Sequence, residues 1–450
     1  IIMKFTAALA LLLTLAPAAA FVAPGHRRAA GVAVRPASSA VAASVAPVEP
    51  RDPLTVPRFA DYGKHQFAGG IADGYLRKQG LSAETLKDPT WVVDRADGVA
   101  AAVLEWATDN DADTFCHWFQ PMASSGFRHG QTGQVYNMMI GFDRTTNELK
   151  FDFDGGALTK GETDGSSYPN GGLRDTHTAG GYLAPDTSSP IFLLNGVIHI
   201  PSVFVSYHGK ALDEKTPLLR ANDAMSEHGC RLLDQLGYDA AASGGLKANI
   251  GLEQEIFLVD REEYFRRPDL QFVGRTIMGK LPARDQELCD HYMAPLTTHT
   301  PALECMREIQ HECFKMGIPL KTRHREVAPG QFEFAPEYGT NTVQIDQNLI
   351  VMQVIEEVAA KHGLAALMQE KPFAGINGSG KHNNWSLSTA SDIPLFLPGP
   401  LNKATGNDLA FPVVMAVVVE WSPRSTSRGT TSASGPWRRR RPSCPPTSAR

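Results

Sequence analysis

Two short segments that combine apolar residues with pairs of glutamates constrain the fold of this chain more than any other feature. In the first, residues 249–259 (NIGLEQEIFLV), apolar residues alternate with polar ones and predict a strand. A period of two places Glu253 and Glu255 on one face of this strand. The opposite face consists of Ile250, Leu252, Ile256 and Leu258. Neighbouring carboxylates repel each other, so the acidic face either lies in water or surrounds a bound cation.

The second segment, residues 325–334 (REVAPGQFEF), indicates that the glutamates converge. Pro329 and Gly330 can form the centre of a turn, and a two-residue hairpin closed there places Glu326 opposite Glu333. Like charges directly opposed on two strands are destabilising, and Pro-Gly does not favour the turns of tight hairpins. Four glutamates on two strand segments still form an oxygen cage for a hard divalent cation. Magnesium and manganese suit such ligands better than zinc does.

A third segment, residues 375–386 (GINGSGKHNNWS), is rich in glycine and polar side chains. It nearly matches the phosphate-binding loop GxxxxGK[ST], but His382 stands where a hydroxyl would hold magnesium. Such a loop follows a strand and opens a helix, whereas the residues before this segment look helical and those after it do not. We interpret it as a ligand loop in which His382 adds a nitrogen to the metal cage and Asn377 and Gly378 contact substrate. A purely structural histidine is the alternative.

The composition is that of a globular protein and excludes several classes. The chain has 450 residues, a formal net charge of −5 and a mean hydropathy of −0.21, which exclude a polytopic membrane protein and imply no general affinity for nucleic acid. Its length predicts two or three domains. The cysteines form no CxxC pair, so we expect no disulfide scaffold or structural zinc site, and a reducing compartment fits. They are Cys116, Cys230, Cys289, Cys305, Cys313 and Cys444.

Residues 1–48 resemble a targeting sequence. The apolar run Leu9–Leu15, followed by small residues, is typical of a signal peptide and too short to span a bilayer. Residues 21–48 contain no acidic residue and several Arg, Ser and Ala, as transit peptides do. Together they resemble the two-part plastid presequence of algae with secondary plastids. We expect a plastid location, with secretion or mitochondrial delivery as alternatives; import of a reporter fused behind residues 1–50 should depend on Phe21.

Between the ends, the pattern changes from strands to helices. Residues 110–200 contain many Gly, Asp and Asn with short apolar alternations, such as residues 151–155 (FDFDG), and predict strands joined by turns. Three segments have helical spacing: Ala221–Leu236, Leu303–Met316 and Asn348–Met368. Asn222 or Asp223 would cap the first of these helices and Gly237 would end it. This arrangement predicts an α+β protein with a small β-rich N-terminal domain.

Four motifs in this order resemble those of the glutamine synthetase family. They are GETDGSSYPNGG, GLEQE, REVAPGQFE and NGSGKHNNWS, and the resemblance covers residues 110–415. Within this family, the sequence resembles most the third, larger class, which is found in some bacteria and algae. The resemblance implies a β-grasp-like N-terminal domain followed by a catalytic domain whose curved antiparallel sheet holds the ligands. We assign residues 49–205 to the first domain and residues 206–420 to the N-terminal portion of the second, which is incomplete in this chain.

The resemblance also implies which residues bind metal. Glu255, Glu326 and Glu333 match the ligands of a first ion, which structures the site and helps to bind glutamate. Glu253 and His382 match ligands of a second ion, which lies between the phosphates of ATP. The expected ion is magnesium or manganese.

Four more residues match positions that contact substrates in the family. Asn377 and Gly378 match the loop that contacts glutamate, and Ser386 matches a contact to ATP. Asp164 matches the aspartate that binds ammonium and helps to deprotonate it, and in the family it comes from a neighbouring subunit. The resemblance therefore implies a ring-shaped homo-oligomer with active sites between subunits. Without the resemblance, Asp164 reads as a turn residue in a glycine-rich loop.

The activity implied by the resemblance is a glutamate–ammonia ligase. ATP phosphorylates the γ-carboxylate of glutamate, and ammonia displaces the phosphate to give glutamine. The expected partners are glutamate, ammonium and ATP, with no nucleic acid and, in the mature form, no membrane.

Residues 421–450 depart from the family pattern. They contain seven arginines and no acidic residue, where the family continues with a motif resembling GNDHRLGANEAPPAI. Residues 436–450, encoded with GC-rich codons and read two bases later, can give EAPPAI. We therefore expect a reading-frame error, which the cDNA sequence across codons 415–450 would reveal, and a chain that is inactive alone as written. The alternatives are a genuine basic tail and a truncated, non-catalytic partner of a full-length subunit.

Overall fold

The fold is taken from a computed structural model in which residues 52–450 form one compact unit. The described residues are 52, 55–56, 59–122, 135–164, 180–280 and 300–421. The expected targeting sequence (residues 1–48) lies outside these described residues. So do residues 422–450 of the expected out-of-frame tail. None of the helices in the described ranges combines the length and apolar character needed to span a bilayer. The cysteines in the same ranges are free thiols: Cys116, Cys230, Cys305 and Cys313.

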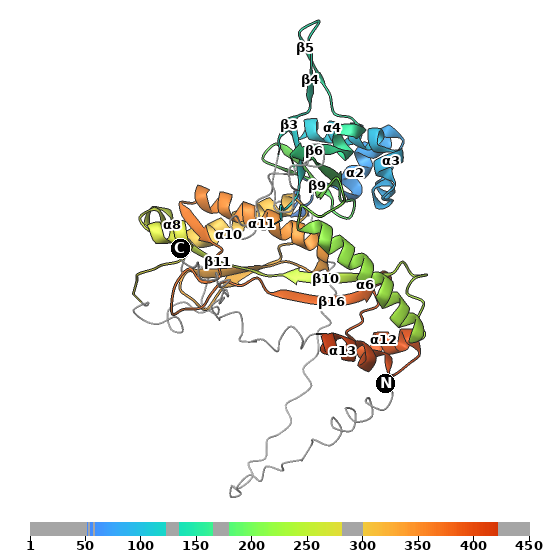
Figure 1. The fold of residues 1–450 in the computed structure, drawn as a ribbon. Coiled ribbons are helices and arrows are strands. Elements are labelled where there is room, and N and C mark those ends of the chain that lie inside the picture. The colour runs from blue at the N-terminus through green and yellow to red at the C-terminus, as the bar shows by residue number, and fades with distance from the viewer. Residues whose placement is uncertain are drawn as a thin grey trace, which may run out of the picture. The chain divides into compact units, whose positions relative to one another are not determined.

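A mixed sheet dominates the N-terminal portion of the unit (blue to green in Figure 1). Its strands are β1 (Gln66–Phe67), β2 (Thr114–Trp118), β3 (Asn137–Met138), β6 (Gly161–Asp164), β7 (Gly180–Pro185), β8 (Ile191–Leu194) and β9 (Val197–Ser206). Five strands follow the order β1-β8-β9-β2-β3, and β7 pairs with both β6 and β9. The β2–β9 pair is parallel, whereas the others are antiparallel.

Short helices and one hairpin complete this portion. They are α2 (Gly69–Leu76), η2 (Arg77–Gln79), η3 (Ala83–Lys87), α3 (Trp91–Asp94), α4 (Ala96–Asp109), α5 (Gly155–Thr159) and the hairpin β4 (Ile140–Asp143) with β5 (Glu148–Phe151). The prediction of strands between residues 110 and 200 is confirmed, with one exception. After β5 the chain enters α5, because the Asp154 carboxylate accepts a hydrogen bond from the N–H of Ala157 at 2.8 Å and so caps that helix.

Two separate antiparallel sheets carry the acidic segments. The three-stranded sheet, in the order β14-β10-β16, contains β10 (Leu246–Leu252), β14 (Gly339–Thr340) and β16 (Asn383–Thr389). The four-stranded sheet, in the order β12-β13-β11-β15, contains β11 (Gln254–Asp260), β12 (Thr322–Arg325), β13 (Gln331–Ala335) and β15 (Leu364–Leu367). Antiparallel sheets with separate helices confirm the α+β class.

The helices of this portion are α6 (Lys215–Gln235), α7 (Arg261–Phe265), α8 (Pro268–Val273), α10 (Thr300–Lys315), α11 (Asn341–Lys361), α12 (Pro398–Thr405) and α13 (Ala410–Trp421). In Figure 1, α10 and α11 run beside the strand β11. Ile309 of α10, Ile355 of α11 and Ile256 of β11 share one buried apolar core. Trp118 and Phe192 of the N-terminal sheet belong to the same core. The sheet that carries the acidic residues is thus supported by packed apolar side chains from both portions.

The predicted helix Leu303–Met316 is confirmed as α10, and the helix predicted at Ala221–Leu236 is confirmed as the larger part of α6, including its end. There Gly237 has a φ of +97°, which suits glycine after a helix. Its start is different, since α6 begins at Lys215 and not near Asn222 or Asp223. The Asp213 carboxylate accepts hydrogen bonds from the backbone N–H groups of Lys215 at 3.0 Å and Thr216 at 3.1 Å. It therefore satisfies two donors of the first turn that have no partner within the helix.

The predicted helix Asn348–Met368 is confirmed in its first part, which belongs to α11, and is wrong beyond Lys361. Gly363 has a φ of +69° and ends the helical path. The apolar residues that follow form β15, which pairs with β11. A short apolar run packs equally well in a helix or in a central strand, so its periodicity cannot distinguish the two.

Candidate active site

The turn predicted at Pro329 and Gly330 forms. Gly330 has a φ of +71°, and the N–H of Gln331 donates a hydrogen bond to the carbonyl oxygen of Ala328 at 3.1 Å. This is the arrangement of a type II turn, in which proline supplies the first central residue and glycine the positive φ of the second. The turn therefore connects β12 to β13.

The register of this hairpin differs from the predicted one. The strand pairing places His324 opposite Glu333, while the N–H of Glu326 donates to the carbonyl oxygen of Gln331 at 2.8 Å. The prediction that Glu326 faces Glu333 is therefore wrong. A type II turn does not match the twist of two paired strands, so the ladder begins again beyond a longer loop. On this side an imidazole faces Glu333 in place of a second carboxylate, whereas Glu255 of β11 faces it on the other side.

The predicted strand 249–259 is interrupted at Glu253, where the chain passes from one antiparallel sheet to the other. The glycine-rich loop completes the pairing on both sides of the break. The N–H of Glu253 donates to the carbonyl oxygen of His382 at 3.1 Å, and the N–H of Glu255 donates to that of Gly380 at 3.2 Å. Glu255 is only 5% exposed, so its carboxylate does not lie on a solvated outer face.

The same loop contacts both carboxylates. Nδ1 of His382 lies 3.0 Å from Oε2 of Glu253, and the side-chain amide of Asn384 donates to the other oxygen of Glu253 at 2.8 Å. The backbone N–H of Gly380 donates to Oε2 of Glu255. The loop therefore brings a histidine and a backbone donor to two glutamates that lie 125 or more residues away in the sequence.

A second histidine links the remaining two glutamates. Nε2 of His324 lies 3.0 Å from Oε1 of Glu333, and its Nδ1 lies 3.5 Å from Oε1 of Glu326. Two groups of possible metal ligands result, each with its ligand atoms within 4.8 Å of one another. One consists of Glu253, Glu333 and His382, and the other of His324, Glu326 and Glu333. Glu333 belongs to both groups and lies between them.

The protonation equilibria reflect crowded negative charge. Burial raises the pKa of Glu333 to about 7, and the neighbouring Glu253 carboxylate adds to this shift. Burial also raises the pKa of Glu255, and Glu326 contributes in the same direction. Burial alone would lower the pKa of His382, but its hydrogen bond to Glu253 and the charges of the surrounding glutamates together outweigh this effect and raise it. A divalent cation would stabilise the ionised carboxylates, so this set of oxygen and imidazole donors fits magnesium or manganese.

Reasoning from the sequence missed His324 as a site residue. Burial alone would lower its pKa, but a hydrogen bond to the carbonyl of Arg325 and the charges of Glu333 and Glu326 raise it. The alternation within the HRE tripeptide was the available signal, because residues two apart on a strand lie on the same face. That spacing groups His324 with Glu326.

The other predicted residues lie at different distances from this cluster. Gly378 is beside it: the Gln331 side-chain amide donates to its carbonyl oxygen at 2.9 Å, and a Cβ at Gly378 would lie 2.3 Å from the Glu370 carbonyl oxygen. Asn377 precedes it in the same loop. Ser386 lies on β16, opposite Asn249 of β10.

Asp164 lies apart from the carboxylate-bearing strands. It ends β6 in the N-terminal sheet, opposite Gly180, and residues 165–179 lie outside the described residues. The rejection of a phosphate-binding loop at residues 375–382 stands, because the strand β16 follows this segment in place of a helix. The expectation that helical residues precede it is wrong, since β15 does.

Comparison with known proteins shows which family this chain resembles. Residues 59–221 match the model of the glutamine synthetase type III N-terminal domain, and residues 231–406 match that of the glutamine synthetase catalytic domain. The chain is 40% identical over 364 residues to a glutamine synthetase of Bacteroides fragilis, which is 80% of this chain and 48% of that protein. It is 42% identical over 308 residues to the type-3 glutamine synthetase of Dictyostelium discoideum, covering 68% of this chain and 40% of that protein.

A cryo-EM structure of Plasmodium falciparum glutamine synthetase aligns with 66% of this chain and 55% of its own, with a TM-score of 0.45 and 16% identity. The chain spans about half or less of the length of the curated relatives named above. Both domain models and both relatives agree on one family, and the N-terminal model and the Dictyostelium relative agree on the type III class. The chain belongs to the glutamine synthetase family, type III class.

Proposed function

We propose that this chain supplies the metal-binding half of a glutamate–ammonia ligase that uses ATP. The convergence of three glutamates and two histidines from three separate segments into two groups that share Glu333, with Glu255 directly opposite Glu333 on the neighbouring strand, carries this proposal. Exposed acidic side chains alone would be unremarkable, but Glu255 and Glu333 are 5% and 6% exposed. Buried carboxylates without a cation are costly, so a site of this kind is built to hold one.

The carboxylate cage would hold two cations. Glu255, Glu326 and Glu333 would ligate one ion, and Glu253 and His382 would ligate the other. The side-chain distances support an arrangement in which Glu333 reaches both positions, and His324 lies close enough to join or orient the first set. When bound, the ions would neutralise negative charge along the path of phosphoryl transfer.

The chain's own residues would then bind and orient the reactants. Asn377 and Gly378 would contact glutamate, and Ser386 would contact the nucleotide. Asp164 would bind ammonium and take its proton, because ammonium must lose a proton before it can attack the phosphorylated γ-carboxylate. These roles rest on the matching motifs. They also imply a homo-oligomer, since the family places this aspartate in the site of a neighbouring subunit.

The non-catalytic alternative is not favoured, because residues 231–406 match the catalytic-domain model and both relatives are glutamine synthetases. The substrates and the assembly are proposals for the whole protein, because the aligned part covers only 48% of one relative and 40% of the other.

Manganese binding tests the proposal directly in the 450-residue chain. Glu255→Ala and Glu326→Ala each remove one charged ligand, so calorimetric titration with Mn²⁺ should show at least about tenfold weaker binding in each variant. Glu263→Ala is the matched control, since that carboxylate is exposed and pairs only with the exposed Arg266. The same two changes in a full-length version should abolish glutamine synthesis. Near-normal turnover of either variant in magnesium would refute the role of that residue.

A further inference from the structure

Gln331 is an uncharged side chain among the carboxylates of the candidate site. It is the first residue of β13, lies opposite Phe257 of β11 and is 1% exposed. Glu333 follows it by two positions, so both side chains lie on the same face of β13. A buried amide has one acceptor oxygen and two N–H donors that need partners, and those partners determine what the side chain holds together.

The Gln331 amide joins the hairpin to the glycine-rich loop. Its oxygen accepts a hydrogen bond from the N–H of Ala328 at 3.2 Å, within the turn that connects β12 to β13. Its nitrogen donates to the carbonyl oxygen of Gly378 at 2.9 Å and to the hydroxyl oxygen of Ser379 at 3.2 Å. Ala328 and Ser379 are both buried, so water offers these bonds little competition. One side chain therefore links segments that lie 47 residues apart in the sequence.

Backbone contacts hold the same stretch of the loop at two further points. The N–H of Ser379 donates to the carbonyl oxygen of Glu370 at 2.9 Å. The N–H of the next residue, Gly380, donates to Oε2 of Glu255, and its carbonyl oxygen accepts from the N–H of Glu255 at 3.2 Å. A shift of the loop at the Gln331 amide would therefore move the N–H group that binds the Glu255 carboxylate.

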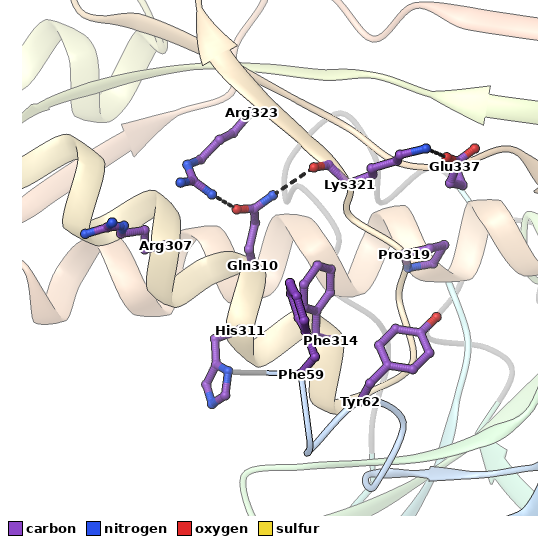
Figure 2. Close-up of a pocket in the computed structure, with 10 residues that line it drawn as sticks. All are labelled: Phe59, Tyr62, Arg307, Gln310, His311, Phe314, Pro319, Lys321, Arg323 and Glu337. Atoms are coloured by element: carbon purple, nitrogen blue, oxygen red, sulfur yellow. Dashed lines mark hydrogen bonds and ion pairs between the residues drawn. The ribbon is translucent and has the colours of Figure 1, made fainter. Parts of the chain in front are cut away.

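A second buried glutamine makes as many hydrogen bonds in a different place. Gln310 of α10 is 7% exposed, and its oxygen accepts from Arg323. Its nitrogen donates to the carbonyl oxygens of Leu320 at 2.8 Å and Lys321 at 3.4 Å. Figure 2 shows it in the wall of a cavity of about 670 Å³, and none of the ten labelled lining residues belongs to the two groups of possible metal ligands. Loss of either amide should destabilise the fold to a similar degree, so a difference between them reports on the site.

We propose that Gln331 is a positioning residue of the candidate active site, which holds residues 378–380 in place between the hairpin and Glu255. It fixes where the Gly380 N–H meets the Glu255 carboxylate, and this part rests only on the contacts described above. It also fixes where Gly378 would meet glutamate, and this part rests on the proposed ligase activity. Gln331 acts through the loop and need not contact metal or substrate itself.

Two substitutions in the 450-residue chain test the first part. Gln331→Met nearly keeps the volume of the side chain and removes its hydrogen bonds. Gln331→Asn keeps an amide that is one methylene shorter, and it carries the test if the Met variant does not fold. In both variants hydrogen exchange at the amides of Ser379 and Gly380 should be about tenfold faster, and calorimetric titration should show about tenfold weaker Mn²⁺ binding.

The same two substitutions at Gln310 are the matched control. They should leave loop exchange and Mn²⁺ affinity within about twofold of the parent chain, because their effect on stability does not pass through the loop. Unchanged loop exchange and Mn²⁺ affinity in a folded Gln331 variant would overturn the proposal. Equal changes in the Gln310 variants would overturn it as well, since they would show a general loss of stability.

Kinetics of a full-length version test the second part. At saturating magnesium, Gln331→Met should raise the KM for glutamate about tenfold and leave the KM for ATP within about twofold, because only the glutamate-contacting loop loses its support. An equal rise in both KM values would contradict positioning of this loop. A parent enzyme that makes no glutamine would refute the proposed activity instead, and loop exchange in the 450-residue chain would still decide the role of Gln331.

Discussion

Lys215 offers a sharp test of how the unit is held together. Its side chain is 7% exposed, and its ammonium group lies 2.5 Å from Oδ2 of Asp186, also contacts Asp346 and donates to Ser189 at 3.2 Å. Asp186 precedes β8 of the N-terminal sheet, Lys215 opens α6 and Asp346 lies in the first turns of α11. One cation therefore joins three segments through two buried carboxylates.

The size of the effect follows from the charge that each change leaves behind. Lys215→Met leaves two buried carboxylates without a cation, and removing one partner of a buried ion pair costs about 3–5 kcal/mol in the free energy of unfolding. Asp346→Asn leaves the pair of Lys215 and Asp186 intact and removes one charged hydrogen bond, which costs about 1–3 kcal/mol. The lysine variant should therefore be the less stable of the two.

The dependence on pH has a definite sign. Burial alone would lower the pKa of Lys215, but Asp346 and Asp186 outweigh it and raise the pKa, so the contribution of the lysine is complete between pH 5 and 7. In Lys215→Met the two buried carboxylates lose their cation, so their folded-state pKa values rise above the unfolded ones. The folded variant then binds more protons, and the stability gap between variant and parent should shrink as the pH falls from 7 to 5.

Guanidinium chloride unfolding at both pH values measures these differences, with hydrogen exchange at the amides of α6 as a local check. Lys247→Met is the matched control, because its partner Asp392 is 81% exposed and such pairs contribute less than about 1 kcal/mol. A loss below about 1 kcal/mol for Lys215→Met, or a larger loss for Asp346→Asn, would refute a buried cation as the link between the segments.

Two further changes probe the candidate site. His324→Leu removes a hydrogen-bond partner of Glu333 and should weaken Mn²⁺ binding about tenfold in calorimetry, whereas unchanged affinity would place His324 outside the site. Gly378→Ala places a Cβ 2.3 Å from the Glu370 carbonyl oxygen, so the loop must shift, with a loss of about 1–3 kcal/mol in unfolding free energy and weaker Mn²⁺ binding. Gly399→Ala, which meets no atom within 4 Å, should be neutral or stabilising in the same assays.

The sequence was sufficient to predict which faces carry charge. Ile256 and Leu258 are buried as predicted, although Glu255 and Phe257 on the opposite face are buried too. The Pro329–Gly330 turn forms because only glycine readily adopts the positive φ of its second position. The helix at residues 303–316 was also predictable, since its apolar residues recur on one face. All three rest on local rules that operate within a few residues.

The errors arose where partners far apart in the sequence decide the structure. The hairpin register depends on how the type II turn joins two twisted strands, and it exchanged Glu326 for His324 opposite Glu333. Residues 364–367 became a strand because β11 offers an open edge to pair with. The start of α6 was missed because Asp213, which lies outside the periodic segment, caps it.

The break at Glu253 explains how so much negative charge can be gathered in one place. A continuous strand would have paired both glutamates with a single neighbouring strand and left their carboxylates to repel each other. The chain instead changes sheets between them, and the glycine-rich loop supplies the missing backbone partners for Glu253 and Glu255. A Cβ at Gly380 would lie 3.4 Å from Oε2 of Glu255 and 3.3 Å from Nε2 of His382, so the loop approaches these two side chains closely at this glycine.

The same loop therefore serves two needs at once. Its backbone satisfies the polar groups left open by the break, and its histidine brings a nitrogen donor to Glu253. What it cannot supply is positive charge sufficient for four carboxylates, and burial together with the neighbouring carboxylates raises the pKa of Glu255 and Glu333. Carboxylates that accept hydrogen bonds from the loop and from two histidines but lack balancing positive charge are the arrangement expected where a divalent cation is the remaining component.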